Sequence, residues 1–458
     1  MKLPEKPIAW ERLLGDLLQD KQQGFETYGE ILRQIKAPVF HGRYLHWDDV
    51  RYRPLPPGLT AELVWLGLKY RRSAAARYLP MKDQADLPFQ YGMVDPVVEL
   101  LHFVDQNAAG RIEMPDSVLN PQTRDSYLVS SLIEEAIRSS QLEGAATTRA
   151  VAQEMLRTGR PPADRDERMI LNNYRTMQYV REIKPQPLTL DLLCAIQRMI
   201  TDQTLERPEA AGRFRRPDEP VGVYDNRDNT LLFAPPPADS LPKRVQLWCD
   251  FANAKIPDFF IHPVVRAIIL HFGLAYEHPF VDGNGRTARA LFYWLMLKQG
   301  YWLCEFLSIS SVLRKAPAQY ARSYLLTETD ENDLNYFIIH QLGVIRQAIR
   351  DLHDHIQRKT VELQAMENTS RVLVELNHRQ KNLMLHALRH PAADYTIESH
   401  RTSHATVYET ARRDLLDLVK RGLLQTIKVG RALHFRPAPD LSEKLADHKN
   451  GHARPHKR

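Results

Sequence analysis

The sequence predicts a mainly α-helical protein that carries two small β elements. Apolar residues recur three and four positions apart through most long segments, which is the pattern of amphipathic helices. Two short β-prone runs around a polar turn, between Val221 and Phe233, predict one hairpin. Toward the C-terminus, a helix, a helix-turn-helix pattern and two short strands follow one another, which predicts a winged helix-turn-helix domain.

Several helix starts are predicted from single residues. Thr60 and Thr189 place a hydroxyl at the N-cap position of apolar-periodic segments, and Ser403 is predicted to do the same. Pro263 suits the first turn of a helix that runs to Tyr276. The aromatic run that begins at Tyr44 is interpreted either as part of the core or as a docking site.

The length and composition of the chain indicate which classes of protein are compatible with it. The chain has 458 residues, 43% of them hydrophobic, which is enough for two or three domains with buried cores. Cys194, Cys249 and Cys304 lie far apart, so neither a disulfide framework nor a zinc site is predicted. The first residues lack the apolar segment of a signal peptide, and no apolar run approaches the roughly 20 residues of a membrane span. We therefore expect a cytoplasmic protein without a membrane partner.

Four regions are expected along the chain. These are a helical region at 1–120, a helical core at 121–366, the winged helix at 370–440 and a basic disordered tail at 441–458. The net charge is +6, but residues 371–458 alone hold 17 Lys or Arg against 9 Asp or Glu, so only the C-terminal module is basic. A long helix near 334–366 is interpreted as a bridge between domains or as a pairing seam, which leaves a homodimer open.

The most informative stretch runs from His278 to Arg289 and reads HPFVDGNGRTAR. Gly283 and Gly285 can adopt positive φ at no steric cost, so the backbone between them can turn its N–H groups toward an anion. The helix that follows directs its positive end to the same place. Arg286 and Arg289 are three residues apart and share a helical face, from which both can grip phosphate oxygens. The stretch predicts a phosphate-binding site.

Two further side chains in the stretch add chemistry. Asp282 offers the hard oxygen ligand that suits an Mg²⁺ ion bridging phosphates. An imidazole has an ordinary pKa of about 6.5, so His278 can act near neutral pH as the base that takes a proton from an attacking hydroxyl.

The stretch resembles the signature of the Fic family, HPFx(D/E)GNGRxxR, at every specified position. The resemblance implies a Fic-type helical core that transfers AMP from ATP, with Mg²⁺, to a Ser, Thr or Tyr hydroxyl of a target protein or of the chain itself. The kinase-like Doc relatives replace the second half of the loop, which this chain keeps, so nucleotidylation is favoured over phosphorylation. The roles implied are base for His278, metal ligand for Asp282, anion hole for Gly283, Asn284 and Gly285, β-phosphate contact for Arg286 and γ-phosphate contact for Arg289.

A helix predicted from about Arg124 to Leu142 ends in a second motif. Ser139 and Glu143 are four residues apart, and Gly144 suits the C′ position. An acidic side chain is unfavourable at a helix C-terminus and indicates a cationic partner, although an ordinary helix end explains the string equally well. The string resembles the Fic inhibitory motif (S/T)xxxE(G/N) of the subclass whose inhibitory helix is N-terminal. The resemblance implies that Glu143 pairs with Arg289 and holds the activity down.

The hairpin has two interpretations. An isolated hairpin is marginally stable, which on the residues alone favours a surface ornament. In Fic proteins a hairpin at this place, the flap, pairs with the target segment by strand addition. The resemblance implies such docking for Val221, Gly222, Val223, Tyr224, Leu231, Leu232 and Phe233.

The C-terminal module leaves its partner open, because winged helices bind DNA or proteins. The candidate DNA contacts are His404, Thr406, Arg412, Arg413, Lys428 and Arg431. One alternative function is therefore a DNA-binding regulator whose Fic core senses nucleotide. A second alternative is a hydrolase that uses the same site, with a water placed by Glu143, to remove AMP from a modified protein. The target protein and the nucleotide base are not predicted.

Overall fold

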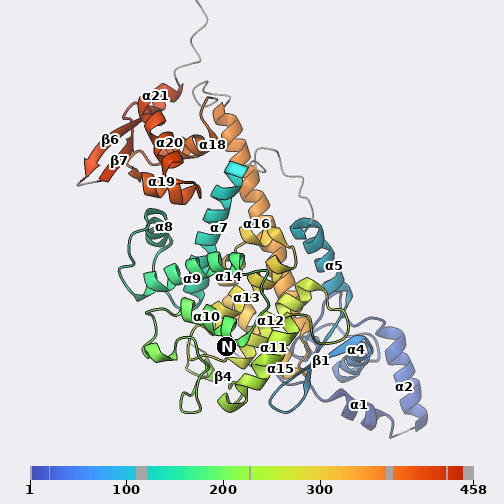
Figure 1. Cartoon of the computed structure of the whole chain (residues 1–458). Helices are drawn as coiled ribbons and strands as arrows, with labels where there is room; N and C mark the ends of the chain where they lie inside the picture. Colours follow the sequence, from blue (N-terminus) through green and yellow to red (C-terminus); the bar gives the residue numbers. More distant parts are fainter. Residues whose placement is uncertain are drawn as a thin grey trace, which may run out of the picture. The chain divides into compact units, whose positions relative to one another are not determined.

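The structure is a computed structural model that describes residues 3–19, 21–109, 121–225, 228–367, 375–429 and 432–446. The predicted mainly α class is confirmed, since helices dominate and strands form only small sheets of two or three strands in the described ranges (Figure 1). The chain divides into two compact units, which interleave along the sequence. The first comprises Met1–Gly110, Arg175–Cys304 and Ile309–Gln347, and the second comprises Arg111–Tyr174, Glu305–Ser308 and Ala348–Arg458. The four predicted regions stay a prediction.

The first unit has two groups of elements. Its N-terminal part contains α1 (Trp10–Leu17), α2 (Lys21–Gln34), α3 (Trp47–Val50), α4 (Ala61–Ala75), β1 (Ala76–Lys82), β2 (Pro88–Gly92) and α5 (Asp95–Val104), which continues into a π-helical turn (Asp105–Ala109). Its central part contains α10 (Leu190–Ile200), β3 (Val223–Tyr224), β4 (Leu231–Phe233), α11 (Leu241–Ala252), α12 (Pro263–Glu277), α13 (Asn284–Lys298), α14 (Ile309–Lys315), α15 (Pro317–Thr329) and the start of α16 (Asn335–Glu367). Short 3-10 turns lie at Pro208–Ala210, Ala238–Ser240 and Trp302–Phe306.

The centre of the first unit is the pair α12 and α13. Both helices are buried along nearly their whole length, and α10 and α11 pack on them. Pro263 occupies the first turn of α12 as predicted, where its missing N–H is not needed by the helix. Since buried helices have little freedom to shift, the loop between α12 and α13 is held at both ends by the core.

The N-terminal part forms its own apolar cluster. Thr60 caps α4 as predicted, through a hydrogen bond that its hydroxyl accepts from the N–H of Leu63. The aromatic run beginning at Tyr44 belongs to the core, because Leu45, His46 and Trp47 are at most 5% exposed. The antiparallel hairpin of β1 and β2 was not predicted. Its first strand, ARYLPMK, contains no Val, Ile or Thr, so the usual signal of a strand is missing.

The second unit contains α7 (Pro121–Leu142), α8 (Arg149–Thr158), the start of α9 (Arg165–Glu182), and the C-terminal elements. These are α18 (His378–Arg389), β5 (Tyr395–Thr396), α19 (Ile397–Ser403), α20 (Tyr408–Lys420), β6 (Leu424–Val429), β7 (Ala432–Pro437) and α21 (Leu441–Ala446), with sheet order β5-β7-β6. Figure 1 shows α18 to α21 and the β6–β7 pair gathered at the orange and red end of the chain. Helix, helix-turn-helix and paired strands thus follow in the predicted order.

Two expectations for the C-terminal elements are wrong. Ser403 does not cap a helix, because it is the last residue of α19, and α20 begins after Val407, whose side chain gives no cap. The first six residues of the predicted disordered tail are helical. Leu441 and Leu445 of α21 are buried in the apolar cluster that α18 and α20 build, and this burial stabilises a helix that composition alone does not suggest.

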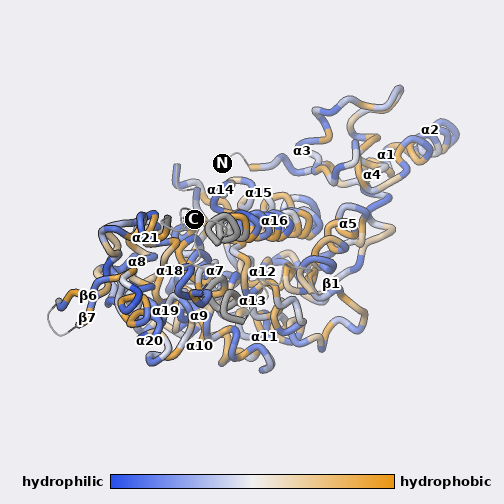
Figure 2. The backbone as a smooth tube through the Cα atoms, turned by 90° about the horizontal axis from the view of Figure 1, so that it is seen from above, coloured by the Kyte–Doolittle hydropathy of each residue, from blue (hydrophilic) through white to orange (hydrophobic). Residues whose placement is uncertain are grey.

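The helices carry both hydrophilic and hydrophobic positions, as Figure 2 shows along the chain. No helix within the described ranges is long and apolar enough to cross a membrane.

Candidate active site

The candidate base ends a buried helix. His278 is the C-cap of α12 and has a left-handed backbone with φ 45, a conformation that a residue with a Cβ adopts at some cost. Its Nδ1 lies 3.3 Å from the carbonyl oxygen of Ala275. A carbonyl can only accept, so this contact places a proton on Nδ1 and leaves Nε2 of the neutral ring as the nitrogen that can take another proton.

The glycine that follows makes the turn into α13. Gly283 has φ +84, and a Cβ on it would meet Cγ2 of Thr201 at 2.8 Å, so both its conformation and its surroundings require glycine. Gly285 lies in the first turn of α13 instead, so only one of the two glycines uses the positive φ expected of both. Because a helix has no internal acceptors for its first N–H groups, the start of α13 directs several of them toward the loop.

Asn284 stabilises the loop through its side chain. Its Oδ1 accepts a hydrogen bond from the N–H of Phe280 at 2.9 Å, and its Nδ2 donates to the carbonyl oxygen of Phe280 at 2.8 Å. Phe280 is 1% exposed, so the loop is also anchored by its aromatic ring. The contribution of Asn284 to the anion hole is therefore limited to its backbone N–H.

The two arginines lie on α13 and are almost completely buried. Arg286 is 1% exposed and Arg289 is 2% exposed. Arg286 donates from Nη2 to Oδ1 of Asp282 at 3.2 Å, while its buried Nε has no hydrogen-bond partner among the described residues. The carboxylate of Asp282 is 37% exposed and so keeps access to solvent. A buried guanidinium with an unpaired donor favours an anionic ligand.

Side chains that the sequence analysis did not single out fix the loop from outside. Arg215 is 8% exposed, donates from Nε to the carbonyl oxygen of His278 at 2.9 Å, and donates from Nη2 to the carbonyl oxygen of Pro236. Gln197 donates to the carbonyl oxygen of Asp282 at 3.0 Å and accepts from the N–H of Gly212 at 2.6 Å. Arg215 therefore holds the His278 end of the loop, and Gln197 of α10 holds the Asp282 end.

A buried carboxylate precedes the base. Glu277 is 1% exposed, accepts two hydrogen bonds from Arg244, at 2.7 and 3.0 Å, and accepts a third from Nε1 of Trp248 at 2.9 Å. The same Arg244 donates to the carbonyl oxygen of Lys82, at the end of β1. No spacing in the sequence indicates these contacts, because the partners lie 29 or more positions apart.

The predicted hairpin is present. Val223 pairs with Phe233 and Tyr224 with Leu231 in antiparallel register, while Val221 and Gly222 precede the first strand. Tyr224 and Leu231 are 50% and 47% exposed, and Leu232 is half-buried. Phe233 packs its ring on Tyr276, with centroids 4.9 Å apart, which ties the hairpin to α12 two residues before His278.

The predicted end of α7 is confirmed. The helix ends at Leu142, Gly144 has φ +97, and the N–H groups of Gly144 and Ala145 donate back to Gln141 and Ser140 in a Schellman arrangement. Ser139 is 2% exposed and the side chain of Glu143 is exposed. The pairing of Glu143 with Arg289 stays a prediction, since the two residues belong to different units.

The candidate DNA contacts divide into three groups. Arg412, Arg413 and Lys428 are exposed on α20 and β6, and Thr406 is half-buried before α20. His404 is wrong as a contact, because it is only 7% exposed and its ring packs against that of His400, with centroids 4.7 Å apart. It is the C-cap of α19, and its side chain is buried there. Arg431 lies outside the described residues.

Comparison with known families adds a second line of support. Residues 187–296 match the family model described as Fic/DOC family. This segment is similar to Fic/DOC family domains. It contains the hairpin and the whole stretch from His278 to Arg289, and it ends within α13. Glu143 and the C-terminal elements lie outside the Fic/DOC segment.

The curated relatives resemble the chain over part of their length. The chain is 27% identical over 277 residues to a protein adenylyltransferase Fic of Nematostella vectensis, which is 60% of this chain and 56% of that protein. It is also 27% identical over 201 residues to the protein of the same name from Drosophila willistoni, covering 42% of this chain and 36% of that one. The chain thus spans about half, or less, of the curated relatives it matches. A crystal structure of a Fic family protein from Desulfovibrio desulfuricans G20 aligns with TM-score 0.48 and 18% identity, over 76% of this chain and 98% of that one.

Proposed function

We propose that this chain is a protein adenylyltransferase, which transfers AMP from ATP to a hydroxyl side chain of a target protein or of itself. The observation that carries the proposal is the stretch from His278 to Arg289. It combines a base, a glycine turn at a helix N-terminus and two buried arginines inside a Fic/DOC domain. The names of the curated relatives support the same activity.

The phosphates of ATP would lie against the start of α13. The first N–H groups of the helix bind phosphate oxygens, and the helix dipole favours their negative charge. Arg286 and Arg289 would contact the β- and γ-phosphates. The unpaired Nε of Arg286 gains a partner when a phosphate oxygen arrives, so binding relieves a buried donor that otherwise lacks one.

Asp282 would hold the Mg²⁺ that accompanies ATP. Protein sites for Mg²⁺ with nucleotides typically supply one or two carboxylates, with phosphates and water completing the shell. The described residues contain no group of three or more His, Cys, Asp or Glu side chains placed to ligate a metal, so Asp282 would share the ion with phosphate oxygens and water. The partly exposed carboxylate of Asp282, one residue before the glycine turn, fits this requirement. When bound, the ion would neutralise phosphate charge.

The transfer step follows from the position of His278. The target hydroxyl oxygen attacks the α-phosphorus, its proton passes to Nε2 of His278, and the bond from the α-phosphorus to the bridging oxygen breaks to release pyrophosphate. The Nδ1 contact to Ala275 holds the ring in the tautomer that this step needs. The exposed edges at Tyr224 and Leu231 would pair with an extended target segment and bring its hydroxyl to the base.

Glu143 would restrain this activity by pairing with Arg289, which takes the γ-phosphate position. Glu143→Gly is then expected to raise AMP transfer strongly, while His278→Ala abolishes it. The Schellman turn needs glycine at 144 but not Glu at 143, so Glu143→Gly leaves the helix end in place. Equal activity of the wild type and Glu143→Gly would remove the regulatory part of the proposal.

The donor, acceptor and target are tested in one experiment. Glu143→Gly protein is incubated in cell lysate with ATP, UTP and CTP, each labelled at the α-phosphate, and labelled peptides are identified by mass spectrometry. Labelling from ATP that disappears in the matched His278→Ala, Glu143→Gly double variant supports the proposal. Absence of transfer from every nucleotide, with ATP binding retained, would contradict it.

Two other functions remain in competition. The exposed Arg412, Arg413 and Lys428 favour a DNA-binding regulator, and a duplex-binding assay with a salt titration tests it, because phosphate contacts weaken steeply as salt rises. Removal of AMP from a modified protein by the same site is tested by incubating pre-modified substrate with Mg²⁺ and no ATP.

A further inference from the structure

A second polar site lies in the first unit, outside the Fic/DOC segment. A cavity of about 70 Å³ lies among α1, α4, the β1–β2 hairpin and the turn that precedes α16. Since about 10 to 15 Å³ measured this way holds one water, the cavity has room for several waters or for one small polar ligand. Aromatic rings of Trp10, Tyr44 and Tyr78 and carboxylates of Glu11, Glu331 and Asp333 are part of its lining.

Two cations on one face of α4 border the cavity, and the first is bonded through all three of its nitrogens to other parts of the protein. Arg72 is 5% exposed and donates to the carbonyl oxygens of Pro38 and Leu45 and to the hydroxyl of Tyr336, at 2.8 to 3.0 Å. Its guanidinium carbon also lies 3.8 Å from the ring centre of Tyr44. Each of the three nitrogens of Arg72 is thus already engaged within the protein.

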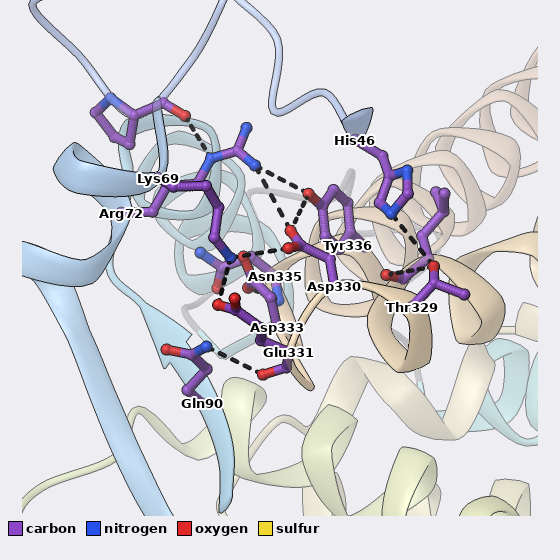
Figure 3. A network of polar contacts seen from close by, with 12 residues as sticks. His46, Lys69, Arg72, Gln90, Thr329, Asp330, Glu331, Asp333, Asn335 and Tyr336 are labelled. Atoms are coloured by element: carbon purple, nitrogen blue, oxygen red, sulfur yellow. Dashed lines mark hydrogen bonds and ion pairs between the residues drawn. The ribbon is translucent and has the colours of Figure 1, made fainter. Parts of the chain in front are cut away.

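The second cation, Lys69, is held by two carboxylates. Its Nζ lies 2.8 Å from Oδ1 of Asp330 and 2.9 Å from Oε2 of Glu331. Figure 3 shows both contacts, with Tyr336 donating to the second oxygen of Asp330. Asp330 is thereby satisfied, and the pKa of its carboxyl is lowered even though burial acts in the opposite direction, chiefly through the charges of Lys69 and Arg72.

The remaining carboxylates exceed the available positive charge. Asp333 is 5% exposed and accepts only neutral donors in the contacts it makes, the hydroxyl of Tyr44 at 2.5 Å and the N–H of Asn335 at 3.0 Å. Glu331 shares Lys69 with Asp330, and Glu11 adds another charge at the cavity. Burial and the charge of Asp330 raise the pKa of Asp333. Burial is also the main cause that raises the pKa of Glu331, and the charges of Asp330 and Glu11 raise it further.

The excess of negative charge around the cavity determines which kind of ligand it can bind. Four carboxylates, those of Glu11, Asp330, Glu331 and Asp333, stand against two cations, so an anion is repelled. A metal ion held by the protein alone is disfavoured as well, since the described residues form no group of three or more His, Cys, Asp or Glu ligands. Aromatic walls and unneutralised carboxylates suit an organic cation that donates hydrogen bonds. We propose that the cavity binds a protonated primary amine on a short alkyl chain, with its ammonium between Glu331 and Asp333.

The entrance lies on the side of Glu331. Its side chain is 38% exposed, whereas Asp333 lies deeper, so an alkylammonium can enter head-first and leave its chain against the aromatic rings at the rim. Tyr78, at 55% exposed, is such a rim residue. The amine can be a free metabolite or the side chain of a lysine on another protein, since both present the same ammonium.

The test uses the full chain and butylamine as the probe. Calorimetric titration is expected to show saturable binding of butylammonium and none of 1-butanol, which has the same alkyl chain without the charge. Glu331→Gln is expected to weaken binding about tenfold or more, since hydrogen bonds to charged groups contribute about 1.5 to 3 kcal/mol. A capped Gly-Lys-Gly peptide forms the second arm. Tighter binding of the peptide than of butylammonium assigns the site to a protein lysine, and weaker binding assigns it to a free amine.

Two further variants keep the test decisive. Glu11→Gln changes an exposed residue of α1 and should therefore leave the fold intact. It replaces Glu331→Gln as the test if that variant fails to fold. It is expected to weaken butylammonium binding severalfold. Asp16→Asn removes the same charge from α1 at a position that does not line the cavity, and should leave binding unchanged. Binding of neither probe, equal binding of butylammonium and 1-butanol, or equal effects of Glu11→Gln and Asp16→Asn would overturn the proposal.

Discussion

Nε of Arg215 donates a 2.9 Å hydrogen bond to the carbonyl oxygen of His278, across 63 positions of sequence. The same guanidinium donates to Pro236, three residues beyond the hairpin strand β4. One buried side chain therefore fixes the candidate base and the exit of the flap to each other. The left-handed backbone of His278 needs such support, because an ordinary residue adopts it only at a cost of about 1 kcal/mol.

Arg215→Ala should lower AMP transfer at least about tenfold and the free energy of unfolding by about 2 kcal/mol. The buried carbonyl oxygen of Pro236 and the partly buried one of His278 lose their donor, and loss of a donor costs a buried acceptor about 1 to 3 kcal/mol before the site relaxes. The measurements are initial rates and denaturant unfolding. Arg216→Ala, at the adjacent exposed position, is the control and should change neither quantity noticeably. Wild-type rates in Arg215→Ala would show that the contact does not position the base.

Glu277→Gln should destabilise the protein by about 3 kcal/mol. The carboxylate is 1% exposed and bonded to Arg244 and Trp248, and breaking a buried ion pair leaves its partner uncompensated. Urea unfolding of the two proteins measures the difference. Asp250→Asn is the matched comparison, because Asp250 pairs with Lys255 at the surface, where an ion pair contributes less than about 1 kcal/mol. Similar losses in both variants would contradict the assignment.

Acid should weaken the segment that leads to the flap. Hydrogen bonds from Arg213 lower the pKa of Glu219 from its ordinary 4.5 to about 2. A carboxyl with a lowered folded pKa contributes stability that is present above its unfolded value and is lost as pH falls toward the folded value. Between about pH 4.5 and 2 the wild type should therefore lose stability faster than Glu219→Gln. Denaturant unfolding over this range is the measurement, and parallel curves would rule the contribution out.

In the C-terminal elements, substitutions of exposed residues should affect DNA binding, whereas substitutions of buried residues should affect stability. If this part binds duplex DNA, Arg412→Ala and Arg413→Ala should each reduce the slope of log affinity against log salt by about 1. His404→Ala should instead lower thermal stability, because the ring is buried against His400. Fluorescence anisotropy and thermal melting measure the two quantities. If His404→Ala changed the slope of log affinity against log salt and the two arginine variants did not, the arginines would not be the DNA contacts and His404 would be one.

The sequence predicted those features that short segments carry by themselves. Thr60 and Thr189 cap helices because a hydroxyl before an apolar repeat satisfies a free N–H wherever the helix lies. Gly144 ends α7 because its positive φ favours glycine in any context. The chemical groups of the loop at 278–289 were predicted for the same reason, since the base, the turn and the arginines are neighbours in the chain.

Features that depend on packing or strand pairing, and not on residue type alone, were not predicted. The strand β1 lacks β-branched residues and forms because β2 pairs with it. His404 has the composition of a surface contact, yet packing at the end of α19 buries it. Gly285 lies in the first turn of α13 rather than in a left-handed turn, since the helix begins one residue earlier.

The sequence by itself determined the mainly α class, several of the helix ends and the chemical groups of the candidate site, because each follows from residues a few positions apart. Only the tertiary structure decided what holds that site. Arg215 and Gln197 bond its loop from 63 and 85 positions away, and Trp248 bonds Glu277, the residue before the base, from 29 positions away. It also decided that Lys69 meets Asp330 across 261 positions, beside a cavity with excess negative charge. A buried polar group requires a hydrogen-bond partner. Tertiary packing determines which residue becomes that partner, and the spacing of residues along the chain does not predict it.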